Sequence, residues 1–191
     1  PYQPNGGNTR DAIKRAKLGV QQQVSYDLFQ FMVASRVALA RHKEWRIAFN
    51  SDSGFFADLL QLDSLADPQT TRQYEDYIAR LNEVPRYFDE NIANIRTGMR
   101  DGFTLPAAVL DGVSKIVAGA QYKSAEDVPL WHSFANSPDT VLTADRARLS
   151  AAGKTALTNA VIPAYAAFQR FFENEYRPAA RQTIGASALS N

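Results

Sequence analysis

A chain of 191 residues is long enough for one domain with a substantial core, or for two small domains. Its 45% hydrophobic and 21% charged residues are typical of globular proteins, which excludes the disordered and fibrous classes. The formal net charge of +1 comes from dispersed acidic and basic residues, so we expect no nucleic-acid partner. The absence of cysteine excludes disulfides, thiol catalysis and iron–sulfur clusters.

The first part of the chain predicts a tail followed by a long helix. Residues 1–10 are turn-forming, which indicates a flexible tail, and they begin without methionine, so we expect that the true N-terminus has been removed. From Asp11 to about Trp45, apolar residues recur at intervals of three, four and seven, the period of a helix. The most apolar run, residues 28–40, is shorter than the ~20 residues of a membrane span and contains charge, so no span is predicted.

The middle of the chain predicts a short helix at residues 55–62 and a longer helical stretch interrupted by a proline. Thr70 and Gln73 have the spacing of a capping box and predict a helix start. The apolar stripe then continues from residue 74 to residue 95 on both sides of Pro85. Proline disrupts a helix, so either one kinked helix or two helices meeting near Glu83 would fit. Because the stripe keeps its phase, we favour the kink.

The last part of the chain predicts three further helical segments. Gly98 and Gly102 indicate a helix end, and Pro106 suits the first turn of a helix over residues 105–121. A short helical segment follows at residues 123–138, and the longest run extends from residue 143 to about residue 181, with Pro163 inside it. No stretch alternates as a half-buried strand does. The sequence therefore predicts an all-α fold of long, kinked, antiparallel helices, forming one helical domain over residues 11–191.

A search for catalytic patterns yields no complete constellation, so we predict no catalytic residue and no metal site. The two histidines, His42 and His132, each lack a second histidine at helical spacing, whereas a catalytic zinc needs about three protein ligands. The sequence AAGKT around Gly153 has Arg148 where a phosphate-binding loop needs glycine. We expect ordinary helix surface at both places.

Two stretches resemble one protein family. The first, YEDYIARLNEVPRYFDENIANIRTGMRDGFTLP at residues 74–106, is similar to a pattern Y-x-x-R-L-x-x-x-P followed by a helix and G-x-x-x-G-x-T-x-P. The second, VIPAYAAFQRFFENEYRPAARQTIG at residues 161–185, is similar to a PAY helix and an EY-x-P-x-x-R segment. Together they resemble the bacterial domain-of-unknown-function family 885. The matching positions of the first pattern are Tyr77, Arg80, Leu81, Pro85, Gly98, Gly102, Thr104 and Pro106.

The resemblance implies a relation to helical zinc metallopeptidases, whose metal-binding helix would lie downstream of the matched region. We therefore expect the N-terminal part of a longer, exported, peptidase-like protein that shapes the substrate cleft but lacks the metal-binding helix. Zinc, a peptide substrate and the missing C-terminal portion would belong to the full-length protein, and this segment alone would be inactive. A periplasmic or other extracytoplasmic location is favoured over the cytoplasm. The alternative is a non-enzymatic helical module that binds a ligand or a protein.

The C-terminal helical run contains the candidate substrate residues. We expect Tyr176, Arg177 and Arg181 to donate hydrogen bonds to a peptide carboxylate or to peptide carbonyls, as the cleft interpretation implies. The alternative is that they cap and brace the helix end. A fragment of a larger protein would also leave an apolar face exposed and self-associate as a homo-oligomer. The residues expected on that face are Tyr165, Phe168, Phe171, Phe172 and Tyr176.

Overall fold

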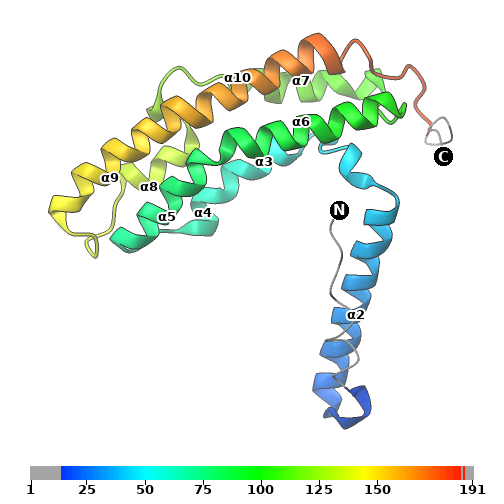
Figure 1. Cartoon of the computed structure of the whole chain (residues 1–191), viewed down its shortest axis with the longest axis horizontal. Coiled ribbons are helices and arrows are strands. Elements are labelled where there is room, and N and C mark those ends of the chain that lie inside the picture. Colours follow the sequence, from blue (N-terminus) through cyan, green and yellow to red (C-terminus); the bar gives the residue numbers. More distant parts are fainter. Residues whose placement is uncertain (1–13, 186, 188–191) are drawn as a thin grey trace. The chain divides into compact units, whose positions relative to one another are not determined.

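The computed structural model describes residues 14–185 and 187, and the regular structure of these residues is helical, with no β-strand among them (Figure 1). The all-α prediction is therefore confirmed. The contacts divide the chain into two units, residues 1–44 and residues 45–191. We call them the N-terminal unit and the helical body and describe each by itself, so the single domain expected over residues 11–191 stays a prediction. The expected tail at residues 1–10 lies outside the described residues.

The helical body consists of two long helical runs and several short helices packed on them (Figure 1). The first run contains α5 (Thr71–Asn82) and α6 (Val84–Arg100). The second run is continuous and contains α9 (Thr143–Ala156), the π-helical segment η7 (Leu157–Val161), α10 (Ile162–Phe171) and the π-helical segment η8 (Phe172–Tyr176). The short elements are η2 (Glu44–Arg46), which spans the unit boundary, α3 (Phe55–Asp58), η3 (Leu59–Gln61), α4 (Leu62–Ala66), η4 (Ala107–Val109), α7 (Leu110–Gly119), η5 (Ala125–Asp127), η6 (Pro129–Trp131) and α8 (His132–Ala135).

The proline in the first run coincides with a boundary between two helices. The helices meet at Glu83, as in the second of the two interpretations of the sequence, although the kink was favoured. Pro85 lies in the first turn of α6, where the missing N–H has no intrahelical partner to lose. Glu83 itself keeps right-handed helical angles, so the apolar stripe keeps its phase across the boundary.

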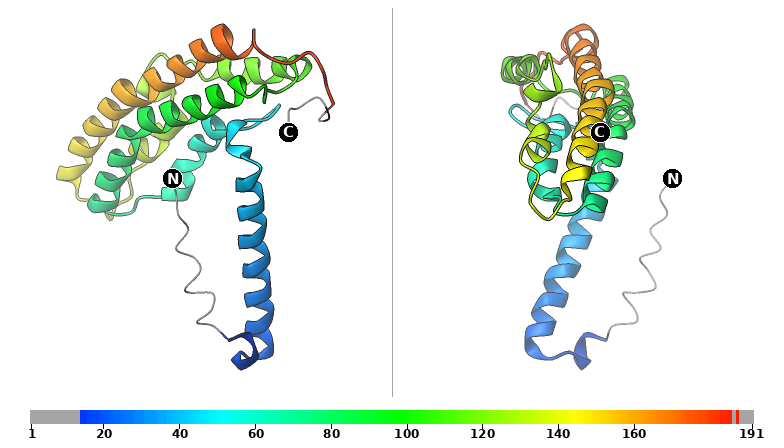
Figure 2. Two further views of the ribbon diagram at one scale, coloured as in Figure 1. Left: turned by 45° about the vertical axis from the view of Figure 1, so that its right-hand side comes forward. Right: turned by 90° about the vertical axis from the view of Figure 1, so that its left-hand side faces the viewer.

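The two long runs lie side by side and point in the same direction (Figures 1 and 2). Thr71 bonds Asp145 near their starts, and Arg96 bonds Glu175 near their ends. The short helix α7 runs the other way, because Asp111 at its start bonds Arg177, whereas residue 122 just beyond its end packs on residue 165. Helix α7 is therefore antiparallel to the runs, whereas the two runs are parallel to one another.

An aromatic cluster fills the core between the runs. Phe168 of α10 is 1% exposed, and its ring lies 4.9 Å from that of Phe56 and 6.1 Å from that of Phe88, measured between centroids. The expectation that the aromatic face of the C-terminal run stays exposed is wrong. All five of its aromatic residues are buried, because segments before α5 and on α6 cover them; they are Tyr165, Phe168, Phe171, Phe172 and Tyr176.

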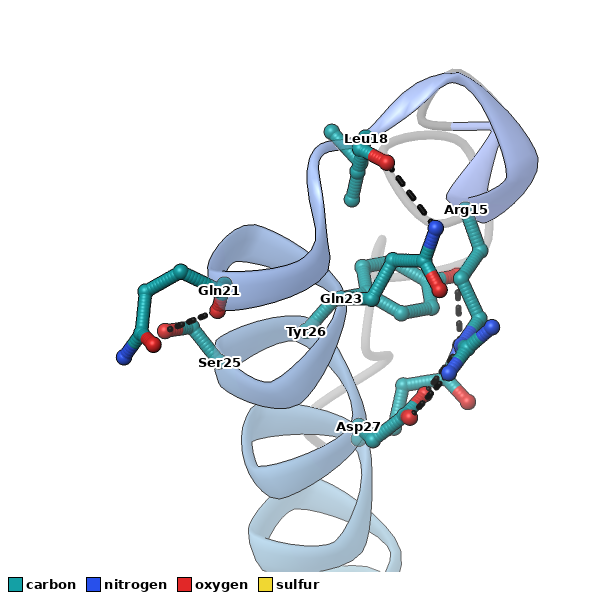
Figure 3. A network of polar contacts seen from close by, with 8 residues as sticks. Arg15, Leu18, Gln21, Gln23, Ser25, Tyr26 and Asp27 are labelled. Atoms are coloured by element: carbon teal, nitrogen blue, oxygen red, sulfur yellow. Dashed lines mark hydrogen bonds and ion pairs between the residues drawn. The ribbon is translucent and has the colours of Figure 1, made fainter.

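The N-terminal unit contains the short helix η1 (Arg15–Lys17) and the long helix α2 (Val20–Arg41) (Figure 3). A long helix is present as predicted, but it is shorter than the predicted range from Asp11 to about Trp45, because extended backbone at Leu18 and Gly19 separates η1 from α2. The guanidinium group of Arg15 donates two hydrogen bonds of 2.6 Å to Asp27, and Gln23 donates to the carbonyl of Leu18. These bonds attach η1 to the first turns of α2. No helix among the described residues is both long enough and apolar enough to cross a membrane.

Candidate functional site

The two sequence stretches that resemble the family meet in space in the helical body. The backbone N–H of Leu105 donates to the hydroxyl oxygen of Tyr176 at 2.8 Å. The backbone N–H of Arg181 donates to Thr104 Oγ1 at 3.1 Å, and its Nε donates to the Thr104 carbonyl at 2.9 Å. The N–H of Ala107 donates to the Arg181 carbonyl at 2.8 Å. We call residues 104–107 and 176–181 the clasp, because these four bonds join segments about 70 residues apart.

Gly98 and Gly102 allow the backbone to turn after α6 and lead into residues 104–107 of the clasp. Gly102 has a φ of 73°, a backbone conformation that favours glycine. A Cβ added to Gly98 would lie only 2.5 Å from the carbonyl oxygen of Arg46, so a side chain there would push the two backbones apart. Thr104, which follows this turn, is 3% exposed and places its hydroxyl group inside the body.

Tyr176 is a buried member of the clasp. Its side chain is 1% exposed, and its ring centroid lies 4.8 Å from that of Phe49. Burial raises the pKa of the Tyr176 hydroxyl, so this group stays neutral at physiological pH. The hydroxyl oxygen accepts a hydrogen bond from the N–H of Leu105, so this backbone group beside the buried Thr104 has a partner.

The two arginines expected to bind substrate hold neighbouring segments. Arg177 donates to Asp111 and to Ser114 Oγ, both at 2.9 Å, and so attaches the end of the second run to α7. The side chain of Arg181 donates to the carbonyls of Thr183 and Gly185 at 2.7 and 2.8 Å. This geometry agrees with the bracing role. The substrate contact assigned to Tyr176, Arg177 and Arg181 stays a prediction.

A groove lies along α6 and the end of the second run, with a volume of about 400 Å³. We call it the α6–α10 groove; it is lined by Asp89, Ile92, Arg96, Ala167, Arg170, Phe171, Asn174 and Glu175. Its apolar area is small, because Ile92 and Phe171 are only 5% and 3% exposed and Ala167 is partly buried. Asn174 and Glu175 belong to the π-helical segment η8, and π-helical segments are rare and often occur at functional sites.

An ion pair crosses the groove and connects the two long runs. Arg96 donates from Nε and from a terminal nitrogen to the two oxygens of Glu175, at 2.8 and 2.6 Å. Its guanidinium carbon lies 5.2 Å from the centroid of the Phe171 ring. The hydrogen bonds raise the pKa of Arg96 and lower the pKa of Glu175, so both groups are charged at neutral pH. The pair therefore holds both sides of the groove in one geometry.

Arg170 is the second cation of the groove, and it has no partner among the described residues. No described residue forms a hydrogen bond or ion pair with its exposed guanidinium group. The site residues predicted from the sequence do not include Arg96, Arg170 and Asn174, because these residues occupy solvent-facing positions of ordinary amphipathic helices. Only the parallel pairing of the two runs brings them together, so no local pattern could have identified them.

A second pocket, of about 410 Å³, contains His132. Asn136 Nδ2 donates to the His132 carbonyl at 3.0 Å and lies 3.1 Å from Nδ1, so Nδ1 accepts and the proton of the neutral ring is assigned to Nε2. Beside it, Asp63 accepts hydrogen bonds from the backbone N–H and the hydroxyl group of Ser133. These bonds attach the segment around α4 to α8.

The described residues do not fit the zinc that the resemblance implies. Among residues 14–185 and 187, no group of three or more His, Cys, Asp or Glu side chains is placed to hold a metal ion. His42 follows α2 in the N-terminal unit, and His132 begins α8 in the helical body. No step proposed below involves a metal bound to these residues.

Comparison with known proteins returns one family. The family model with the description "Bacterial protein of unknown function (DUF885)" matches residues 7–188, which includes both stretches that form the clasp. No curated protein matches the chain, and no solved structure matches it.

Proposed function

The chain belongs to the DUF885 family of bacterial proteins, and we propose that its helical body positions a peptide for a zinc-dependent, peptidase-like protein without itself hydrolysing the peptide. The observation that supports this proposal is the α6–α10 groove. Two of its lining residues, Asn174 and Glu175, directly precede Tyr176 near the end of the second run, where substrate contacts are predicted from the sequence.

The groove combines the features that bind a peptide segment. Peptide backbone needs hydrogen-bond donors and acceptors, and peptide side chains need apolar surface. Asn174 supplies an amide that can both donate and accept, while Ala167 and the exposed edges of Ile92 and Phe171 supply a small apolar area. Such a mixture of one apolar area with a few oriented polar groups is typical of ligand sites.

The groove is also held in place before any ligand binds. The Arg96–Glu175 pair joins its two sides, and the clasp attaches the end of the second run to the segment that follows α6. A site whose groups are already oriented loses less conformational entropy on binding. The groove can therefore hold a peptide with modest contact area.

In this proposal the hydrolytic chemistry belongs to another part of the same polypeptide. A zinc ion bound there would activate water, and the helical body would present the peptide. An exported, periplasmic protein is part of the proposal. A helical module that binds peptides without any associated hydrolysis is the second candidate, and it would use the same groove.

The proposal is tested by blocking the groove without changing its charge. Ala167 is partly buried and lines the groove, so Ala167→Leu places extra volume inside it. The matched control is Ala151→Leu, the same substitution at an exposed position of α9. Isothermal titration calorimetry with an N-acetylated Ala-Ala-Phe peptide measures binding, and mass spectrometry of the same samples measures hydrolysis.

We expect the wild-type chain and Ala151→Leu to bind the peptide, Ala167→Leu to bind it about tenfold more weakly or not at all, and none to hydrolyse it. Equal binding by Ala167→Leu and the control would contradict the proposed groove. Hydrolysis at a rate proportional to protein concentration would contradict the non-catalytic role. Extending the chain with the downstream coding sequence separates the two candidates, since only the peptidase-like protein would then cleave the peptide with zinc.

A further inference from the structure

We propose that the α6–α10 groove recognises the free C-terminal carboxylate of a peptide through Arg170, with the last side chain on the apolar surface of the groove. This inference rests on the proposed peptide-binding function and names the part of the peptide that the groove selects.

Arg170 rather than Arg96 is the group available to an incoming anion. Two nitrogens of Arg96 already donate to both oxygens of Glu175, which occupies one edge of its guanidinium group. Arg170 lies in α10, four residues before Asn174, and no described residue bonds its guanidinium. A planar guanidinium binds a carboxylate through two parallel hydrogen bonds, so the geometry of Arg170 suits this anion.

The charges around the groove favour an anion of low charge. Its lining contains two arginines, Arg96 and Arg170, and two carboxylates, those of Asp89 and Glu175, so the formal charges cancel. A monovalent carboxylate can pair with Arg170, whereas a dianionic phosphate would experience stronger repulsion from the two carboxylates. The groove is therefore more suited to a peptide carboxylate than to a phosphorylated ligand.

The residues beside Arg170 indicate which carboxylate fits. The partly buried Ala167, with the exposed edges of Phe171 and Ile92, supplies a small apolar surface beside the cation, against which the side chain of a terminal residue can pack. The Asn174 amide lies within the same lining and can bond the last peptide group. An α-carboxylate, an apolar side chain and a peptide group occur together at the C-terminus of a peptide.

Two pairs of peptides separate this inference from the proposed function. The first pair is N-acetyl-Ala-Ala-Phe with a free carboxylate and the same peptide with a terminal amide. The second pair is N-acetyl-Ala-Ala-Gly with a free carboxylate and N-acetyl-Ala-Ala-Asp with a terminal amide. In the Asp peptide, the carboxylate is on the side chain. We expect the free Phe acid to bind best and its amide to bind roughly tenfold more weakly, because a charge-assisted pair is lost.

Three variants test the residues. Arg170→Gln removes an exposed cation and should abolish the difference between acid and amide. Glu175→Gln should increase affinity for the acid severalfold, because it removes a repelling carboxylate while the Gln carbonyl can still accept a hydrogen bond from Arg96 across the groove. Lys115→Gln is the control, since Lys115 is an exposed cation of α7 with no bond to a described residue, and it should bind as wild type does.

Each outcome decides the inference. Equal affinity for acid and amide, while both peptides still bind, would overturn the carboxylate site and leave the peptide-binding function intact. Binding of the Asp amide as tightly as the Phe acid would overturn the assignment to the C-terminus. If the wild-type protein binds none of these peptides, the proposed function itself is refuted. An unchanged acid preference in Arg170→Gln, with circular dichroism showing a folded protein, would overturn the role of Arg170.

Discussion

Replacement of Gly153 by alanine sets helix propensity against core packing. Gly153 is a buried position in the interior of α9, where alanine normally stabilises a helix by up to about 1 kcal/mol over glycine. Here the added Cβ would lie 2.4–2.7 Å from three ring carbons of Phe134. Phe134 is 5% exposed, and its ring packs against those of Tyr74, Tyr77 and Trp131, so it has little room to move.

The cost of overpacking the core should exceed the gain in helix propensity. Overpacking of a filled core costs about 1–3 kcal/mol, against a propensity gain of about 1 kcal/mol or less. We therefore expect Gly153→Ala to lower the free energy of unfolding by about 1–2 kcal/mol and the melting temperature by about 3–8 °C. Thermal unfolding followed by circular dichroism at 222 nm, with urea midpoints, measures both quantities.

Two matched variants isolate the cause. Gly119→Ala lies at the exposed end of α7, where an added Cβ meets no atom within 4 Å, so it should be neutral or slightly stabilising. Phe134→Leu in the background of Gly153→Ala should recover part of the loss, with a coupling energy of about 1 kcal/mol. A Gly153→Ala protein as stable as wild type, or additive effects in the double variant, would refute the close contact between Gly153 and Phe134.

Two further predictions concern the clasp and the buried tyrosines. Thr104→Val should lower the free energy of unfolding by about 1–2 kcal/mol, because the partly buried N–H of Arg181 loses its acceptor, the hydroxyl group of the buried Thr104, while Thr104→Ser should retain most of the stability. Equal urea midpoints for the two variants would contradict this. Burial raises the pKa of Tyr77 and Tyr165 above the value of about 10 in the unfolded chain, so their stabilising contribution is present below pH ~10 and is lost as the pH rises further. The part of the 295 nm absorbance that belongs to Tyr77 and Tyr165, obtained by difference from their Tyr→Phe variants, should therefore rise together with alkaline unfolding. Ionisation of these two residues in a protein that stays helical would contradict the prediction.

Local physics accounts for what the sequence predicted correctly. Helix starts depend on neighbouring residues, and Thr70 does accept the N–H of Gln73 at 3.3 Å. The second bond of a capping box is replaced, because the Gln73 side chain accepts a hydrogen bond from the N–H of Gln69 at 2.7 Å rather than from the N–H of Thr70. The all-α class follows from apolar spacing, which reports the face of each helix that must be buried.

Tertiary structure decided which faces meet, and therefore which groups are free. An apolar stripe predicts burial but does not identify the segment that covers it. The interpretation of the chain as a fragment of a larger protein predicts that the aromatic residues of the second run are exposed, but segments before α5 and on α6 cover them. The bonds between Tyr176 and Leu105, and between Arg181 and Thr104, span more than 70 residues of sequence. The α6–α10 groove likewise exists because two long runs lie parallel, which brings Arg96 to Glu175 and leaves Arg170 without a partner among the described residues. Long-range pairing of this kind depends on the summed packing of the whole body, to which each local pattern contributes only a small part.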